Sequence, residues 1–128
     1  MTTFWVPGKP IGQGAIRHSR GGIGYHANGN ELKPWRVKVA WCAKAVGVPI
    51  LQGAVQVEYH FVLLKPKSVK REFPTVAPDL DHYIRALGDA LKGVAFLDDA
   101  QICKIVSTKS YGENEGVEIT VSPYLTSP

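Results

Sequence analysis

The sequence has few cysteines and no long run of apolar residues. Only Cys42 and Cys103 occur among the 128 residues, and neither belongs to a Cys-x-x-Cys motif, so a disulfide framework is not indicated. We expect both to be buried free thiols, since a free cysteine packs like a small hydrophobic residue. Mostly apolar stretches such as Ala54–Leu64 are far shorter than the about 20 residues that cross a bilayer. No membrane span is therefore expected.

A secretory signal and a zinc site are also not indicated. The first ten residues, MTTFWVPGKP, lack the basic start and apolar run of a signal peptide, which favours a cytoplasmic location. The four histidines, His18, His26, His60 and His82, are scattered along the chain. Without cysteine clusters they do not form the ligand spacing of a structural zinc site. Any metal should therefore be held by oxygen ligands.

Acidic residues are scarce in the first part of the chain. Residues 1–78 contain eleven Lys or Arg and three Asp or Glu, which gives a net charge of +8. Residues 79–128 contain four Lys or Arg and eight Asp or Glu, which gives a net charge of −4. A basic body with a local acidic concentration suits an enzyme that attracts a polyanion and holds a cation. A solvated surface of uneven charge is the alternative, and composition does not separate the two. The length and the 45% hydrophobic content fit one domain over residues 1–128.

Hydrophobic periodicity predicts four strands and two helices. We predict the strands at Thr3–Val6, Ala54–Leu64, Gln101–Lys109 and Gly116–Val121, and the helices at Glu31–Val46 and Leu80–Lys92. The first helix should bury one stripe, made of Trp35, Val39, Cys42, Ala43 and Val46, and gather basic residues opposite, at Lys33, Arg36 and Lys44. The second should bury Leu80, Ile84, Leu87 and Leu91, with Asp79 or Asp81 as N-cap and Gly93 just past its end.

Two segments carry basic residues outside these elements. The loop 65–78, KPKSVKREFPTVAP, has the densest basic patch, with Lys65, Lys67, Lys70 and Arg71. Its Phe73 could insert into or stack on nucleic acid, or pack into the core. The glycine-rich stretch 12–30 includes Arg17, His18 and Arg20. It predicts a mobile hairpin or loop, either a plain flexible segment or a basic arm that clasps nucleic acid.

The run PDLDHYIRALGDALKGVAFLDDAQI concentrates the carboxylates. Its acidic members are Asp79, Asp81, Asp89, Asp98 and Asp99. If a short turn follows the second helix, residues 96–99 can return beside the helix start and bring three or four carboxylates together. Such a cluster repels itself unless a cation neutralises it, and hard oxygen ligands favour Mg²⁺ or Mn²⁺. Taken singly, either Asp pair could instead be a helix cap or a turn.

Arg85 and His82 stand within this run. Arg85 lies one helical turn after Asp81, and Asp89 one turn after Arg85, so the three could form a surface ion-pair ladder. The functional alternative places Arg85 against the scissile phosphate, where a fixed cation stabilises developing charge, with Asp89 orienting it. His82 could position a water or a phosphate, or be an ordinary exposed helical residue.

In this run the sequence resembles the RusA family of Holliday-junction resolvases. The residues that match the family's signature are Asp79-Leu80-Asp81-His82, Arg85, Asp89-Ala90-Leu91 and Asp98-Asp99-Ala100-Gln101. Pro7-Gly8-Lys9-Pro10 and Arg17 look like the family's opening strand and basic loop. Two residues depart from the pattern, since His82 stands where the family usually has Asn and Arg85 where it usually has Lys.

The resemblance implies an α+β fold, a two-layer sandwich of a mixed β-sheet with two α-helices packed on one face, assembled as a homodimer. It implies a Mg²⁺-dependent endonuclease, with Mn²⁺ as an alternative ion, that resolves Holliday junctions by paired symmetric nicks in DNA recombination and repair. Asp79, Asp81 and Asp99 would hold the metal with help from Asp98, and Arg85 would neutralise the transition state. The expected DNA contacts are Lys9, Arg17, Arg20, Lys65, Lys67, Lys70 and Arg71.

Two other functions remain open from the sequence. The departures at His82 and Arg85 are compatible with a non-catalytic DNA-binding protein whose resolvase site has decayed. A metal-dependent hydrolase of nucleotides or other small phosphorylated molecules is the second, and it would not retain a four-way junction.

Overall fold

The computed structural model describes residues 1–14, 16–18, 24–26 and 29–125. Its strands are β1 (Thr2–Pro7), β2 (Ile16–His18), β3 (Gly24–His26), β4 (Val55–Leu63), β5 (Ile102–Tyr111) and β6 (Gly116–Pro123). Its helices are α1 (Gly29–Ala45), α2 (Leu80–Leu91) and the short 3₁₀ turn η1 (Asp99–Gln101). All six elements predicted from periodicity are confirmed, with ends that differ by at most two residues.

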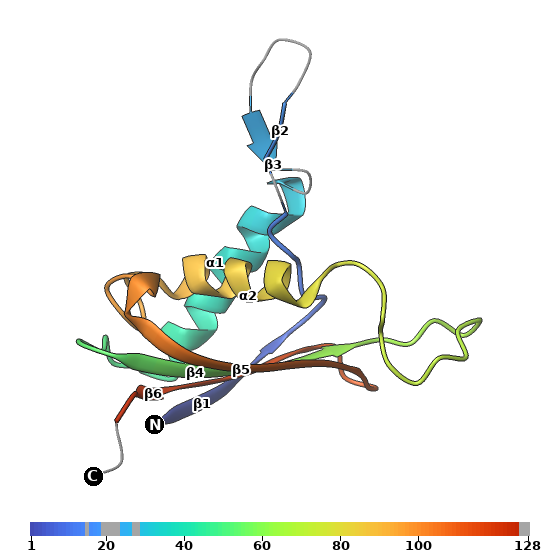
Figure 1. Ribbon diagram of the computed structural model, residues 1–128. Helices are drawn as coiled ribbons and strands as arrows, with labels where there is room; N and C mark the ends of the chain where they lie inside the picture. The colour runs from blue at the N-terminus through green and yellow to red at the C-terminus, as the bar shows by residue number, and fades with distance from the viewer. Residues whose placement is uncertain (15, 19–23, 27–28, 126–128) are drawn as a thin grey trace.

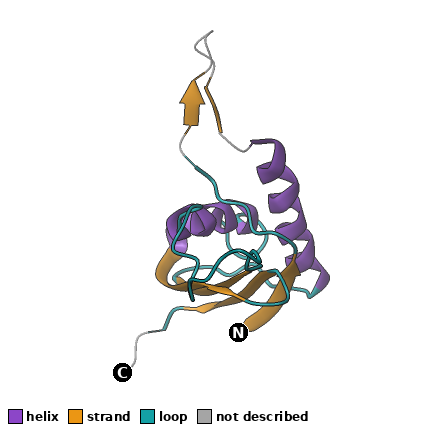
Figure 2. Cartoon of the chain, turned by 90° about the vertical axis from the view of Figure 1, so that its right-hand side faces the viewer, coloured by secondary structure: helices purple, strands orange, loops and turns teal. Residues whose placement is uncertain are grey.

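Four strands form one mixed sheet in the order β1-β6-β4-β5. β6 is antiparallel to both β1 and β4, while β5 runs parallel to β4. Both helices lie on the same face of this sheet (Figure 1), and the view from the side separates a helical layer from a strand layer (Figure 2). The expected α+β two-layer architecture is therefore confirmed. The strands β2 and β3 form a separate antiparallel hairpin that projects beyond α1 (Figure 1).

The core lies between the sheet and the two helices. Alternate residues of β4 point into it, because successive side chains of a strand face opposite sides; these are Val55, Val57, Tyr59 and Phe61, all buried. The ring of Phe61 stacks on that of Tyr83 from α2, with centroids 5.0 Å apart. Burying an aromatic side chain of this size contributes about 2–3 kcal/mol. This packing fixes α2 above the middle of the sheet.

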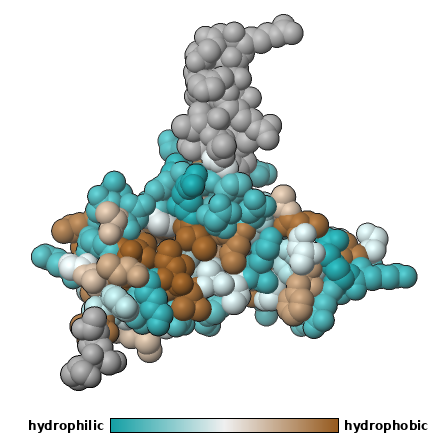
Figure 3. All heavy atoms as spheres, in the orientation of Figure 1, coloured by the Kyte–Doolittle hydropathy of each residue, from teal (hydrophilic) through white to brown (hydrophobic). Residues whose placement is uncertain are grey.

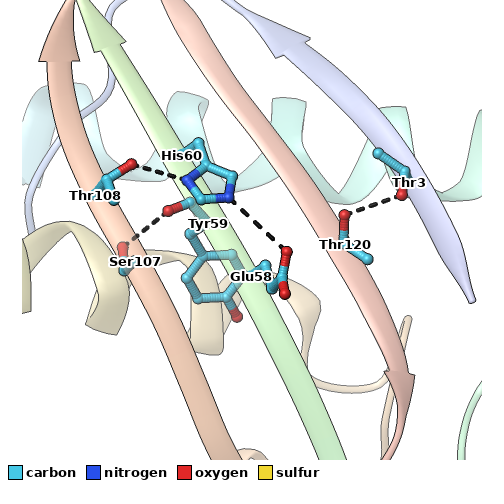
Figure 4. A network of polar contacts seen from close by, with 7 residues as sticks. All are labelled: Thr3, Glu58, Tyr59, His60, Ser107, Thr108 and Thr120. Carbon is cyan, nitrogen blue, oxygen red and sulfur yellow. Dashed lines mark hydrogen bonds and ion pairs between the residues drawn. The ribbon is translucent and has the colours of Figure 1, made fainter.

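The other face of the sheet carries mostly polar side chains, with Trp5 and Val106 as exposed hydrophobic exceptions. Side chains that alternate with the core residues form hydrogen bonds across neighbouring strands, as between Thr3 and Thr120 at 2.9 Å and between His60 and Thr108 at 2.8 Å (Figure 4). Glu58 lies 3.9 Å from His60 on the same face. His60 therefore has a structural environment, as expected from the sequence, on the sheet face that points away from the helices.

The burial of four residues corrects the sequence-based expectations. Cys103 is exposed, because it lies on β5, which is an edge strand, and Cys42 is only half-buried. Val46 is 52% exposed, because α1 ends one residue before it. Arg36 is not on a solvated basic face but half-buried between the helices, where it pairs with Asp89 of α2.

Hydrophobic side chains also reach the surface. A band of them crosses the middle of the face seen in Figure 3. Phe73 is 56% exposed, so the structure does not place it in the core. Within the described segments, neither helix combines the length and apolarity of a membrane-crossing segment.

Two glycines give a prediction on stability. A methyl group at Gly116 would meet the Val6 carbonyl oxygen and the Trp5 ring, so Gly116→Ala should destabilise the fold by about 1–3 kcal/mol through overpacking. A methyl group at Gly88 inside α2 would meet Asp99 at an ordinary 3.7 Å. Gly88→Ala should therefore stabilise the protein by about 0.5–1 kcal/mol, because alanine favours helix more than glycine. Urea unfolding of both variants checks the opposite signs, and equal shifts would contradict the packing described.

Candidate functional site

The start of α2 carries two exposed carboxylates and a histidine. Ligand atoms of Asp79, Asp81 and His82 all lie within 4.8 Å of one another. Asp79 is the N-cap residue, but its side chain makes no capping hydrogen bond. Its carboxylate is therefore not used by the helix end and is available to bind a cation.

The segment before Asp79 is held by a lysine from β5. The Lys109 ammonium donates hydrogen bonds to the Val76 carbonyl at 2.8 Å and to the Pro78 carbonyl at 3.0 Å. The Ala77-Pro78 peptide bond is cis. Lys109 thus ties the residues directly before Asp79 to the sheet, which fixes where α2 and its first carboxylate begin. The sequence analysis did not identify this lysine.

The second acidic pair lies in the turn between α2 and β5. The helix ends at Leu91, and Gly93 follows with a positive φ of 80°, as expected for the residue past a helix end. The side-chain oxygen of Gln101 accepts from the Leu97 and Asp98 amides, and its nitrogen donates to the Leu51 and Gly53 carbonyls. Gln101 therefore fixes the turn that presents Asp98 and Asp99. This role was also missed, because its partners are backbone groups distant in sequence.

Asp99 does not join the group of Asp79, Asp81 and His82. It packs against Gly88, whose added Cβ would lie 3.7 Å from an Asp99 carboxylate oxygen. Residues 96–99 therefore return beside the third turn of α2, and not beside its start as the sequence analysis expected. Gly88 follows Asp81 by seven residues, which places it on the same helix face about 10 Å further along the axis. The acidic residues thus line one face of α2 in two groups.

The carboxyls in the turn have different proton affinities. The Ala100 amide donates to Asp98 at 3.2 Å, and this bond first, then the hydrogen bond with Asp99 and the charge of Lys92, hold the pKa of Asp98 below its usual range. The pKa of Asp99 is raised, first by its hydrogen bond to Asp98, then by partial desolvation and by the charges of Asp98 and Asp89. A cation near Asp99 would therefore compete with a proton for this carboxyl.

Arg85 is exposed and forms no ion pair within the segments that the structure describes. Asp89 was expected to orient it, but Asp89 pairs with Arg36 of α1 at 3.6 Å. The reason is that the two helices pack together, so Asp89 turns toward α1 and away from the solvent side of α2. The ladder predicted from sequence spacing is therefore not formed. Arg85 lies between the two acidic groups, one turn after Asp81.

The expected DNA contacts are only partly described. Lys9 and the loop residues Lys65, Lys67, Lys70 and Arg71 are exposed. Arg17 lies on β2, but its side chain is outside the described part of the chain, and Arg20 lies wholly outside it. The Arg71 guanidinium donates to the Tyr111 hydroxyl at 3.0 Å, which anchors the basic loop to the end of β5. The loop leads directly into the start of α2 (Figure 1).

The donor set at the start of α2 fits a divalent cation. Two exposed carboxylates offer hard oxygen ligands, the type that Mg²⁺ and Mn²⁺ prefer. The nitrogen of His82 adds a softer donor that the sequence analysis had not counted among the metal ligands. Fold and site together define a small α+β domain with an acidic, cation-suited helix face beside a basic loop.

The comparisons with known proteins agree with this description. The family model described as "Endodeoxyribonuclease RusA" matches residues 7–122. The uncharacterized protein YqaN of Bacillus subtilis (strain 168) is 30% identical to this chain over an aligned length of 132 residues. The alignment covers 92% of this chain and 93% of that protein. The chain belongs to the RusA family of endodeoxyribonucleases.

Proposed function

We propose that this protein is a Mg²⁺-dependent endonuclease that resolves four-way DNA junctions by paired, symmetric nicks. The observation that carries the proposal is the pair of exposed carboxylates, Asp79 and Asp81, beside an exposed arginine and a basic loop in a member of an endodeoxyribonuclease family. The acidic face and the adjacent cations supply the two functions that a nuclease needs, metal binding and phosphate binding.

In this mechanism Asp79 and Asp81 hold the cation, with His82 close enough to assist. Asp98 and Asp99 form a separate acidic group beside Gly88, further along the same face of α2, and would add negative charge that attracts the cation. A divalent cation held there would lower the pKa of a bound water and offset phosphate charge. Arg85 contacts the scissile phosphate from between the two groups, and its fixed charge stabilises the negative charge that develops in the transition state.

We infer further that the active form is a homodimer. A four-way junction has two equivalent strands to be cut, and a twofold dimer presents two equivalent sites. Both edges of the four-stranded sheet, β1 and β5, lack a further strand partner within the described chain, so an edge is available for a second copy.

The experiment is digestion of a supercoiled plasmid that extrudes a cruciform, with and without Mg²⁺. We expect cutting only with Mg²⁺, and linear plasmid as the main product, because two nicks within one binding event open both strands. Nicked circles as the main product would contradict paired cleavage. Junction binding with no cutting in Mg²⁺ or Mn²⁺ would instead support a non-catalytic DNA-binding protein.

The basic loop predicts a strong dependence on salt. Contacts to several phosphates release counterions, so if Lys9, Lys65, Lys67, Lys70 and Arg71 make one contact each, the slope of log affinity against log salt should be near −4 to −5 per protomer. Anisotropy titrations of a labelled junction in EDTA measure this slope at NaCl concentrations between about 50 and 200 mM. Replacing Lys67 and Lys70 by alanine should reduce it by about two. A flat salt response would argue against phosphate contacts.

A further inference from the structure

A groove adjoins the first acidic group of α2. Its volume is about 260 Å³, and its walls are the basic loop, the end of β5 and the start of α2. Pro78 and Tyr83 both line it, and Asp79 stands between them in the sequence. Tyr83 is also bound to Asp79 through the backbone, since its amide donates to the Asp79 carbonyl at 3.3 Å. The groove and the proposed metal site are therefore neighbours on one rigid helix end.

The groove has an aromatic residue, Tyr111, in its wall. Tyr111 is held in place by two contacts, the hydrogen bond from Arg71 to its hydroxyl at 3.0 Å and the Lys65 ammonium 5.8 Å from its ring centroid. Leu63 and Pro74 add apolar surface. Aromatic rings fixed in this way are the surfaces on which nucleobases stack, a contact worth about 1–3 kcal/mol per base.

Polar groups stand at specific places in the same groove. Lys9 and Arg71 supply positive charge, and Glu115 supplies a carboxylate acceptor. Burial, and then the charge of Glu115, raise the pKa of the Tyr83 hydroxyl to about 12. An occupant would thus meet cations and one acceptor beside apolar side chains. A nucleotide, with an apolar flat base that carries polar edges and an anionic phosphate, matches this arrangement.

The size of the groove limits the occupant to one such group. Sites for drug-sized ligands have volumes of about 300–1,000 Å³, and this groove is slightly smaller. It cannot hold a segment of duplex, whose bases are paired and stacked. A base must leave the stack to enter it, which costs a few kcal/mol and least where pairing is already disturbed. The crossover of a four-way junction is such a place.

We propose that the groove binds one unpaired nucleobase of the strand to be cut, stacked on Tyr111, while Lys9 and Arg71 contact its flanking phosphates. This proposal rests on the proposed function, because the base is supplied by the junction bound at the acidic site. It gives the protein a means to recognise the crossover, since a base is available there without the full cost of opening a pair.

The test measures the coupling between the tyrosine ring and the base. Each test junction carries one mismatched, and therefore unpaired, base near the crossover. A matching junction has an abasic nucleotide at the same position. Such pairs are made for each position around the crossover, and the affinities of the two junctions are compared by anisotropy in EDTA. We expect wild type to lose about tenfold in affinity at one position. Tyr111→Leu should show no such loss there, because its stacking surface is already gone.

Matched variants separate stacking from folding. Tyr124→Ala removes another partly exposed tyrosine that does not line the groove, and it should behave like wild type. Tyr111→Phe keeps the ring without its hydrogen bond, and it should retain at least half of the abasic effect on a logarithmic scale. This variant allows the proposal to be tested even if the leucine variant does not fold.

An equal abasic effect in wild type and Tyr111→Leu, or none at any position in wild type, would overturn the base site. Junction cutting by the same proteins, assayed separately with Mg²⁺, would leave the proposed function standing, whereas no junction binding by wild type overturns both.

Discussion

Asp81→Asn is expected to abolish junction cleavage while leaving junction binding nearly unchanged. The substitution keeps the shape of the side chain but removes a charge from the group formed by Asp79, Asp81 and His82. A neutral amide is a much weaker ligand for a hard divalent cation than a carboxylate. We expect the cleavage rate to fall by at least about a thousandfold, comparable to the loss of a main electrostatic group in other active sites. Single-turnover cleavage and anisotropy on the same junction measure both quantities.

A matched control separates this effect from a general change of charge. Glu118→Gln removes an exposed carboxylate from the open face of the sheet, away from α2, and should cut at the wild-type rate. Mn²⁺ binding followed by electron paramagnetic resonance gives a second readout, because Asp81→Asn should weaken it and Glu118→Gln should not. Undiminished cutting by Asp81→Asn would remove the proposed metal site.

Arg85→Ala is expected to give the second-largest loss, about a hundredfold to a thousandfold in cleavage rate. Arg85 has no ion-pair partner in the described chain, so its removal should not destabilise the fold, and the loss should fall on the chemical step. Arg85→Lys should recover most of the rate if the residue acts only as a fixed charge. The lysine variant matters because the RusA family usually has lysine at this position.

Lys44→Ala serves as the control for Arg85, since Lys44 is an exposed cation on the last turn of α1. It should lower affinity slightly and leave the single-turnover rate of the bound junction unchanged. If Arg85→Ala lowered binding as much as it lowered the overall cleavage, Arg85 would be a phosphate anchor and not a group that acts in the transition state.

The sequence was most informative where the physics is local. The apolar alternation that buries Val55, Val57 and Tyr59, and the amphipathic stripe of α2 with Gly93 after it, depend on near neighbours in the chain. They predicted the elements and their ends closely. The fold class came from the resemblance to a known family, because periodicity does not determine which strands pair or that β5 would run parallel to β4.

The candidate site was less predictable because it depends on packing between distant segments. Asp89 was assigned to Arg85 from helical spacing, and the choice of Arg36 instead follows from the way α1 packs on α2, which spacing along α2 cannot show. The return of Asp99 to Gly88 depends on Gln101 and its bonds to residues 51 and 53. The fixing of Asp79 by Lys109 depends on β5. Only the adjacency of Asp79, Asp81 and His82 was visible in the sequence.

The parallel pairing of β4 and β5 has a further consequence. Parallel neighbours cannot be joined by a tight turn and need a crossover connection, and here the crossover consists of the basic loop, α2 and the turn with Asp98 and Asp99. Every group assigned to chemistry on α2 therefore sits on the only covalent bridge between the two strands. Deleting α2 would also remove core residues such as Tyr83 and Leu87, so catalysis can be eliminated without loss of the fold by exchanging side chains on this segment.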